Sequence, residues 1–217
     1  MRWFGVFLLF IIGIPILLFL IWGFVSSGKL IDHQKLRKNT MENIKDDNYS
    51  RVFTSSEYAS KIFFDEKKKK FKIANISLED LNDKNVSPTI KEYSFDDIAD
   101  VEIVIDNKTL TKVSKGEAAL GATIGGAVGG GVGAIIGGGT ASSSAQEFIK
   151  SIHLRITVED YDNPYYDIAF FSGVFYDPDL KTAHKKSSPE VQKAIKEIDT
   201  WFRYFKLAIR DAAKVAH

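Results

Sequence analysis

The stretch Ser151-Ile-His-Leu-Arg-Ile-Thr-Val-Glu159 decides the fold class of this chain. Its apolar side chains alternate strictly with polar ones, which is typical of a strand with one buried and one solvated face. Such strands belong to antiparallel sheets, because the strands of parallel sheets are buried on both faces. The stretch therefore predicts an antiparallel sheet that packs one face on a core.

Other segments of the chain repeat this alternation on both sides of the stretch. Turn-forming residues separate them, as in Asp162-Asn-Pro164 and Asp106-Asn-Lys108. The charged run Asp65–Lys70 is expected to form the solvated turn of a hairpin. The remaining predicted strands centre on Ile62–Phe64, Phe71–Ile73, Val101–Ile105, Leu110–Val113 and Tyr166–Phe170.

A helix is predicted over residues 189–214. Ser188 is a favourable N-cap residue, and Pro189 fits the first helical position. The apolar residues of this segment form one broad arc that includes Trp201 and Phe205, which we expect to be buried against the sheet. The alternative is a basic amphipathic helix that lies on a membrane.

The N-terminus carries an uncharged apolar run from Trp3 to Val25. As a helix this run would span roughly 35 Å, enough to cross a hydrocarbon core of about 30 Å. The alternative is a cleaved signal peptide, although the run exceeds the usual length of its apolar region. Residues 1–27 are therefore predicted to be a single-pass anchor in the cell membrane. More Lys and Arg residues follow the run than precede it, which favours a cytoplasmic location for the bulk of the chain.

The rest of the chain divides into two parts by composition. Residues 28–56 are polar and charged and are predicted to be a juxtamembrane tether, with a short helix before Asp46 as one alternative. Residues 57–214 are predicted to form one α+β domain. Its core is a curved antiparallel sheet, closed by the C-terminal helix.

A glycine-rich insertion at residues 118–140 interrupts the predicted strands. Five of its glycines recur at intervals of four residues, which places them on one face of a helix and lets another backbone approach closely. They are Gly121, Gly125, Gly129, Gly133 and Gly137. A helical hairpin that dips into the membrane or packs against copies of itself is the preferred interpretation, since the strands on either side are expected to share a sheet. A single membrane span and a flexible loop are the alternatives.

Catalytic and cofactor motifs are missing from the sequence. The chain has no cysteine, and its four histidines lack metal-ligand spacing. The glycines lack the Lys-Ser/Thr of a nucleotide loop. A net charge of +1 gives no overall attraction for nucleic acid. The acidic pairs Asp96/Asp97, Asp160/Asp162 and Asp177/Asp179 are interpreted as turns or strand ends, with a hydrolase as a weakly supported third class. We expect no enzymatic activity, no cofactor and no metal.

Lys67, Lys68, Lys69 and Lys70 are interpreted first as a soluble turn and second as candidate contacts to anionic lipid headgroups, where each lysine is worth about 1 kcal/mol.

Four segments in order carry a family resemblance: Ile62–Ile73, Tyr93–Ile103, the five glycines, and Ile152–Val158. Over about residues 55–212 the chain resembles uncharacterised bacterial and phage-encoded proteins, in which a strand-rich domain likened to the bacterial pleckstrin-homology (PH) or GRAM-like fold carries a glycine-rich insertion. Some relatives end in a helical SHOCT tail, which this chain lacks. The resemblance implies a small curved sheet closed by a C-terminal helix. It implies no activity and no site residues.

The functional prediction is a membrane-anchored, non-catalytic interaction module that binds a protein partner or the membrane surface. The alternative is a glycine-zipper membrane protein that oligomerises or perturbs the envelope. The expected partners are membrane lipids and either another protein or a second copy of the chain.

Overall fold

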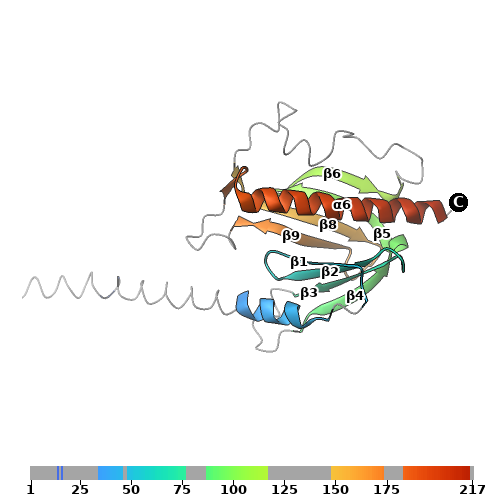
Figure 1. The fold of residues 1–217 in the computed structure, drawn as a ribbon, viewed down its shortest axis with the longest axis horizontal. Helices are drawn as coiled ribbons and strands as arrows, with labels where there is room; N and C mark the ends of the chain where they lie inside the picture. The colour runs from blue at the N-terminus through green and yellow to red at the C-terminus, as the bar shows by residue number, and fades with distance from the viewer. Residues whose placement is uncertain are drawn as a thin grey trace, which may run out of the picture.

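The computed structural model of the chain describes residues 14, 16, 34–45, 48–76, 87–116, 148–173 and 183–215 (Figure 1). They form an α+β domain in which a long C-terminal helix packs on antiparallel sheets. The predicted anchor 1–27, apart from Ile14 and Ile16, lies outside these residues, as do the five zipper glycines. Within the described part of the chain, no helix combines the length and the apolar character that a membrane crossing needs.

The first sheet contains four antiparallel strands in the order β1-β2-β3-β4. The predicted hairpin is confirmed, since Ile62 pairs with Ile73 and Phe64 with Phe71 across the β2–β3 ladder. The strand β4 is not apparent in the sequence, because most of its side chains remain at least partly exposed. The bounds of the strands are Arg51–Thr54 for β1, Ser60–Asp65 for β2, Lys70–Asn75 for β3 and Thr89–Ser94 for β4.

The second sheet has the order β6-β5-β8-β9, and all its neighbouring strands are antiparallel. The alternation that predicted β8 is confirmed, because every second side chain from Ile152 to Val158 is buried. Asp106 and Asn107 form the predicted turn, with φ angles of 48° and 65° that suit the left-handed hairpin turns favoured by these residue types. The strand bounds are Ile98–Ile105 for β5, Lys108–Ser114 for β6, Ser151–Val158 for β8 and Tyr165–Ser172 for β9.

The prediction of one curved sheet is corrected to two four-stranded sheets. The 3₁₀ turn η3 (Phe95–Asp97) separates β4 from β5. Ser94 donates both its backbone N–H and its hydroxyl to the Asp97 carboxylate, at 2.7 and 2.8 Å. This local hydrogen bonding offers the backbone an alternative to continued strand pairing, so the chain turns from one sheet into the other.

A two-stranded ribbon completes the strand structure. It pairs β7 (Phe148–Ile149) with β10 (His184–Lys185). Ile149 is buried, and His184 packs edge-on against the Phe171 ring. The outward side of the ribbon carries Phe148 and Lys185, both exposed.

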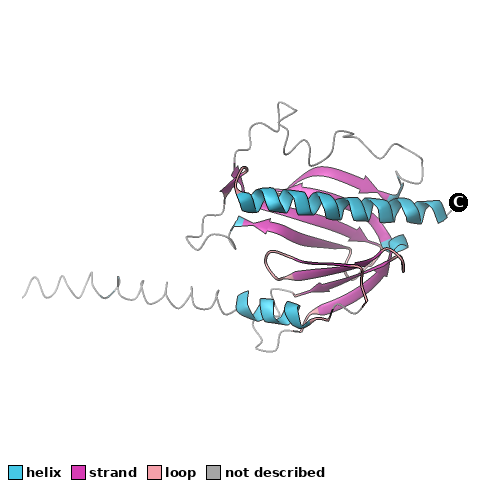
Figure 2. Cartoon of the chain, viewed as in Figure 1, coloured by secondary structure: helices cyan, strands magenta, loops and turns pink. Residues whose placement is uncertain are grey.

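The helix α6 (Pro189–Val215) lies across the second sheet, as Figure 2 shows, and its aromatic side chains also reach rings of the first sheet. Its start at Pro189 agrees with the prediction. Phe205 is fully buried and meets the rings of Phe64 and Phe71 edge-on, while Trp201 is 7% exposed. The predicted burial of both aromatic residues is confirmed. The alternative of a helix lying on a membrane through this apolar arc is excluded, because the arc forms the core.

The region predicted as a tether contains ordered structure. Arg51–Thr54 forms β1, which pairs with β2 and belongs to the first sheet. Residues 34–43 form a helix whose Met41 is fully buried. The folded domain therefore begins before residue 57.

Candidate functional site

The β2–β3 turn holds three of the four lysines that the sequence analysis singled out, and the fourth, Lys70, is the first residue of β3. Its conformation is fixed by Asp65, whose carboxylate accepts the backbone N–H groups of Lys67 and Lys68 at 3.0 and 3.1 Å. Such side-chain-to-backbone bonds are the usual way in which Asp shapes a turn. The hydrogen bond from the Lys68 N–H is the main cause that lowers the pKa of Asp65.

The four lysines do not act as one charged group. Lys68 lies 3.3 Å from Asp65, and Lys70 lies 2.8 Å from Glu92, which raises the pKa of Lys70. Lys67 and Lys69 are exposed and have no acidic partner among the described residues. The turn therefore offers two unpaired cations rather than four.

An aromatic and cationic cluster lies beside this turn. The Lys72 ammonium lies 4.2 Å from the centroid of the Phe63 ring and 4.9 Å from that of Tyr49. The Tyr49 hydroxyl donates to Glu92 at 2.6 Å. Burial is the main cause that raises the pKa of Tyr49, and the bond to Glu92 adds to it. This cluster attaches the segment before β1 to the outer face of the first sheet.

The helix at residues 34–43 is docked on the same face. Met41 packs into a cluster with Phe63, Ala74 and Ile76, all of them buried. Lys61, which is only 5% exposed, donates from its ammonium group to the backbone oxygens of Met41 at 3.2 Å and Ile44 at 2.9 Å. The last carbonyl groups of a helix lack partners within the helix and carry partial negative charge. Lys61 supplies both the missing donors and the opposite charge.

Contacts along this face give the direction of the helix. Its C-terminal end lies at Lys61, near the start of β2, and Lys38 lies 5.9 Å from the Tyr58 ring in the β1–β2 turn. The chain then runs towards the opposite end of β2, where the Asn48 carbonyl accepts from Lys68. The start of the helix and the lysine turn therefore lie at opposite ends of the first sheet (Figure 1).

The strands that flank the glycine insertion belong to one sheet. The strand before it, β6, pairs with β5, and β5 pairs with β8, which follows the insertion. Both ends of the insertion are thereby attached to the same folded domain. The insertion itself lies outside the described residues, so the helical hairpin predicted for it stays a prediction.

A buried polar network joins the two sheets, and sequence reasoning did not find it. The Tyr93 hydroxyl lies 2.8 Å from the Tyr166 hydroxyl and 2.7 Å from the Asp160 carboxylate. Lys91 forms an ion pair with Asp160 at 2.7 Å. Lys91, followed by Tyr93, lowers the pKa of Asp160. No sequence signal links these residues, since β4 was not predicted and its partners lie far along the chain.

The other candidate groups that the structure describes have structural partners or lie on a solvated face. Asp160 accepts hydrogen bonds within the network, while Asp97 shapes the corner between the sheets. His153 lies on the polar face of β8, as predicted. Among the described residues, no three His, Asp or Glu side chains gather as they would around a metal ion. Asp177 and Asp179 lie outside the described residues.

Comparison with known proteins identifies the family. Residues 50–172, from the start of β1 to the end of β9, match the model of a family described as a glycine zipper containing PH domain. The chain belongs to this family. The resemblance inferred from the sequence is thereby confirmed, and the matched range covers both four-stranded sheets and the glycine insertion between β6 and β8.

Two named proteins are similar to the chain over most of its length. The immunity protein of Bacillus phage SPbeta is 31% identical over 194 residues, which cover 88% of this chain and 90% of the phage protein. The SPbeta prophage-derived uncharacterized membrane protein YomJ of Bacillus subtilis strain 168 is also 31% identical over 194 residues, which cover 88% of this chain and 80% of YomJ. No solved structure matches the chain.

Proposed function

We propose that this chain is a membrane-anchored, non-catalytic interaction module that acts in immunity by binding a protein partner next to the bilayer. The observation that carries this proposal is the docking of helix 34–43 on the first sheet through Lys61 and Met41. A relative named an immunity protein and another named a membrane protein support the biological setting.

The docked helix limits the distance between the domain and its proposed anchor. A chain can span at most about 3.3–3.6 Å per residue, so the segment between Val25 and residue 34 reaches roughly 30 Å. Because the helix is fixed to the domain rather than free, the start of the helix marks the end of the domain that faces the bilayer. The glycine zipper and the transmembrane anchor complete this proposed arrangement.

The same geometry places the lysine turn, which is the β2–β3 turn with Lys67 and Lys69, where it can contact a protein. Lys67 and Lys69 lie at the end of the first sheet opposite the start of helix 34–43, so they point away from the bilayer that holds the anchor. Two unpaired cations on a fixed turn suit an acidic protein surface, where complementary charge guides association and discriminates between partners. We therefore propose a protein contact here instead of the headgroup contact that the sequence suggested for Lys67–Lys70.

Site-specific photocrosslinking of the intact protein in its native membranes tests this function. A crosslinker at Lys69 is expected to capture one protein partner, whereas a crosslinker at Lys196, on the exposed side of α6, is not. Lipid adducts alone at Lys69 would contradict the proposal.

A phage challenge tests the proposed role of the chain in immunity. Bacillus cells that express the chain are expected to reduce plating of SPbeta-type phage, and Lys67→Glu combined with Lys69→Glu is expected to restore plating. The matched double variant Lys193→Glu and Lys196→Glu makes the same change in charge on α6 and should still protect. Equal protection by both double variants would reject the role of the lysine turn.

Self-association through the glycine zipper is the second candidate function. The five glycines at intervals of four residues favour it, because they allow close backbone contact between helices. Chemical crosslinking in membranes should then show oligomers that Gly129→Leu removes. Gly116→Leu is the matched control, since a Cβ atom at Gly116 meets nothing within 4 Å. Oligomers that survive Gly129→Leu would exclude the zipper as their cause.

A further inference from the structure

We propose that the β7–β10 ribbon is a second membrane contact, which binds the anionic headgroups of the bilayer that holds the anchor. The ribbon presents Phe148, which is 47% exposed, directly opposite Lys185 in the ladder. Lys150 and Lys186 follow these two residues along the chain. An exposed aromatic ring flanked by lysines is the composition of surfaces that lie in the headgroup region.

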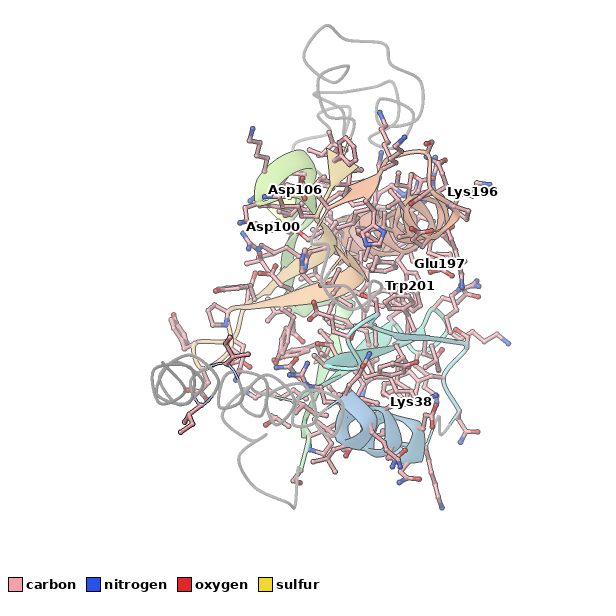
Figure 3. All side chains as sticks on the ribbon, turned by 90° about the vertical axis from the view of Figure 1, so that its left-hand side faces the viewer. Lys38, Asp100, Asp106, Lys196, Glu197 and Trp201 are labelled. Atoms are coloured by element: carbon pink, nitrogen blue, oxygen red, sulfur yellow. The ribbon has the colours of Figure 1, made fainter. Side chains whose placement is uncertain are left out.

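The ribbon lies at the end of the domain where helix 34–43 begins. Lys38 of the helix contacts Tyr58 of the β1–β2 turn, and Ser56 of that turn donates to the Ala169 carbonyl of β9 at 2.8 Å. Just beyond β9, the Gly173 N–H donates to the Lys150 carbonyl at 2.8 Å. Figure 3 views the molecule from this end and labels Lys38 on the helix and Asp106 at the β5–β6 turn.

Acidic groups near the ribbon are engaged inside the protein. Asp106 accepts the backbone N–H groups of Lys150 and Ser151 at 2.9 and 2.8 Å. Glu190 lies 2.9 Å from the ring of His184. In contrast, no ion pair is found for Lys150, Lys185 or Lys186 within the described ranges. The ribbon therefore carries three lysines available to external anions, beside one exposed aromatic side chain.

This inference rests on the proposed anchoring and adds to it the orientation of the domain on the membrane. The anchor fixes one point of the chain close to the bilayer, and the ribbon supplies a second point on the same end of the domain. Each lysine near an anionic surface contributes about fivefold to association, so the three together contribute roughly a hundredfold. With both contacts in place, the lysine turn faces away from the membrane.

Fluorescence of the full chain in lipid nanodiscs tests the ribbon. The chain has no cysteine, so a single cysteine at the exposed Ser187 can carry an environment-sensitive fluorophore next to the lysines. In nanodiscs that contain phosphatidylglycerol, we expect a blue-shifted emission and protection from a soluble quencher. In nanodiscs of phosphatidylcholine alone, both effects should be lost.

Two triple variants make the test specific. Replacing Lys150, Lys185 and Lys186 by Gln should abolish the protection, and Phe148→Ser should reduce the blue shift. Replacing Lys67, Lys69 and Lys214 by Gln removes the same charge at the opposite end and should leave the emission and the quenching of the fluorophore unchanged. Protection that survives the first triple variant, or that is lost in the second, would overturn the inference. A chain that does not enter nanodiscs at all would instead reject the proposed anchor.

Discussion

The ammonium group of Lys61 lies 2.9 Å from the backbone carbonyl oxygen of Ile44, so the second strand of the domain caps the end of the helix that precedes it. A buried lysine is expensive unless its charge is compensated. Here the compensation comes from the C-terminal carbonyls of a helix, which accept its hydrogen bonds. The contact makes the helix a part of the domain instead of a tether.

Lys61→Met should detach this helix. The substitution keeps the aliphatic length but leaves the Met41 and Ile44 carbonyls without their donor, which should lower the free energy of unfolding by about 1–3 kcal/mol. Hydrogen exchange over residues 38–44 of the full chain should become faster, while exchange in β8 stays slow. Lys196→Met on the exposed side of α6 is the control. Unchanged exchange near residue 41 would show that Lys61 does not hold the helix.

Phe205→Ala should destabilise the domain strongly. The ring is fully buried and contacts Phe64 and Phe71, so its removal leaves a cavity that costs about 3–5 kcal/mol. Urea unfolding followed by far-UV circular dichroism measures this loss. Leu207→Ala, at a side chain that is 44% exposed, should cost under about 1 kcal/mol. A similar loss in both variants would contradict the packing of α6 described here.

Asp160 should make the stability of the domain sensitive to acid. Its pKa in the folded protein is lowered by Lys91 and Tyr93, so the unfolded chain binds a proton at a higher pH than the folded one. The stabilisation is complete above the ordinary pKa of about 4 and declines as the pH falls below it. Asp160→Asn should therefore be less stable than the native chain at pH 7, and the difference should shrink at pH 3. A difference that stays constant over this range would argue against the ion pair.

Single cysteines at Ser114 and Ser143 should be labelled from the same side of the membrane. Because β6 and β8 share a sheet, both ends of the insertion must lie in one compartment. An impermeant thiol reagent applied to intact cells should reach neither position if the domain is cytoplasmic, and both after permeabilisation. Labelling of both in intact cells would reverse the predicted orientation. Labelling of only one would contradict the shared sheet.

The local pattern of apolar, polar and turn-forming residues predicted the parts of the fold that are determined by residues close together in the sequence. Strict alternation located β8, and the sequence Asp106-Asn107 located a hairpin turn, because both signals are complete within a few residues. The predicted arc of α6 placed Trp201 and Phe205 correctly for the same reason. The positions of these elements could be predicted without knowing which residues pack against them.

Long-range contacts account for what the sequence did not reveal. The bond between the Tyr93 and Tyr166 hydroxyls joins residues 73 positions apart, and neither residue type predicts such a partner. From the sequence alone, Lys61 cannot be distinguished from a solvated lysine, because its burial depends on the end of a helix that packs over it. Of the candidate site residues, Lys67–Lys69 were correctly placed on a turn, whereas Lys70 begins β3. The pairing of Lys68 and Lys70 with carboxylates depends on tertiary structure. The zipper glycines lie outside the described residues, so their packing remains a prediction.

The order of strands in the second sheet sets a lower limit on the length of the connection that carries the glycine insertion. Since β6 and β8 are both antiparallel to their common neighbour β5, they run in the same direction. The connection between them must return from the far end of the sheet to the near end, a distance of about 26 Å for strands of eight residues. Deletions in this family can therefore shorten the whole connection between Ser114 and Ser151 only to about eight extended residues before the crossover fails to close.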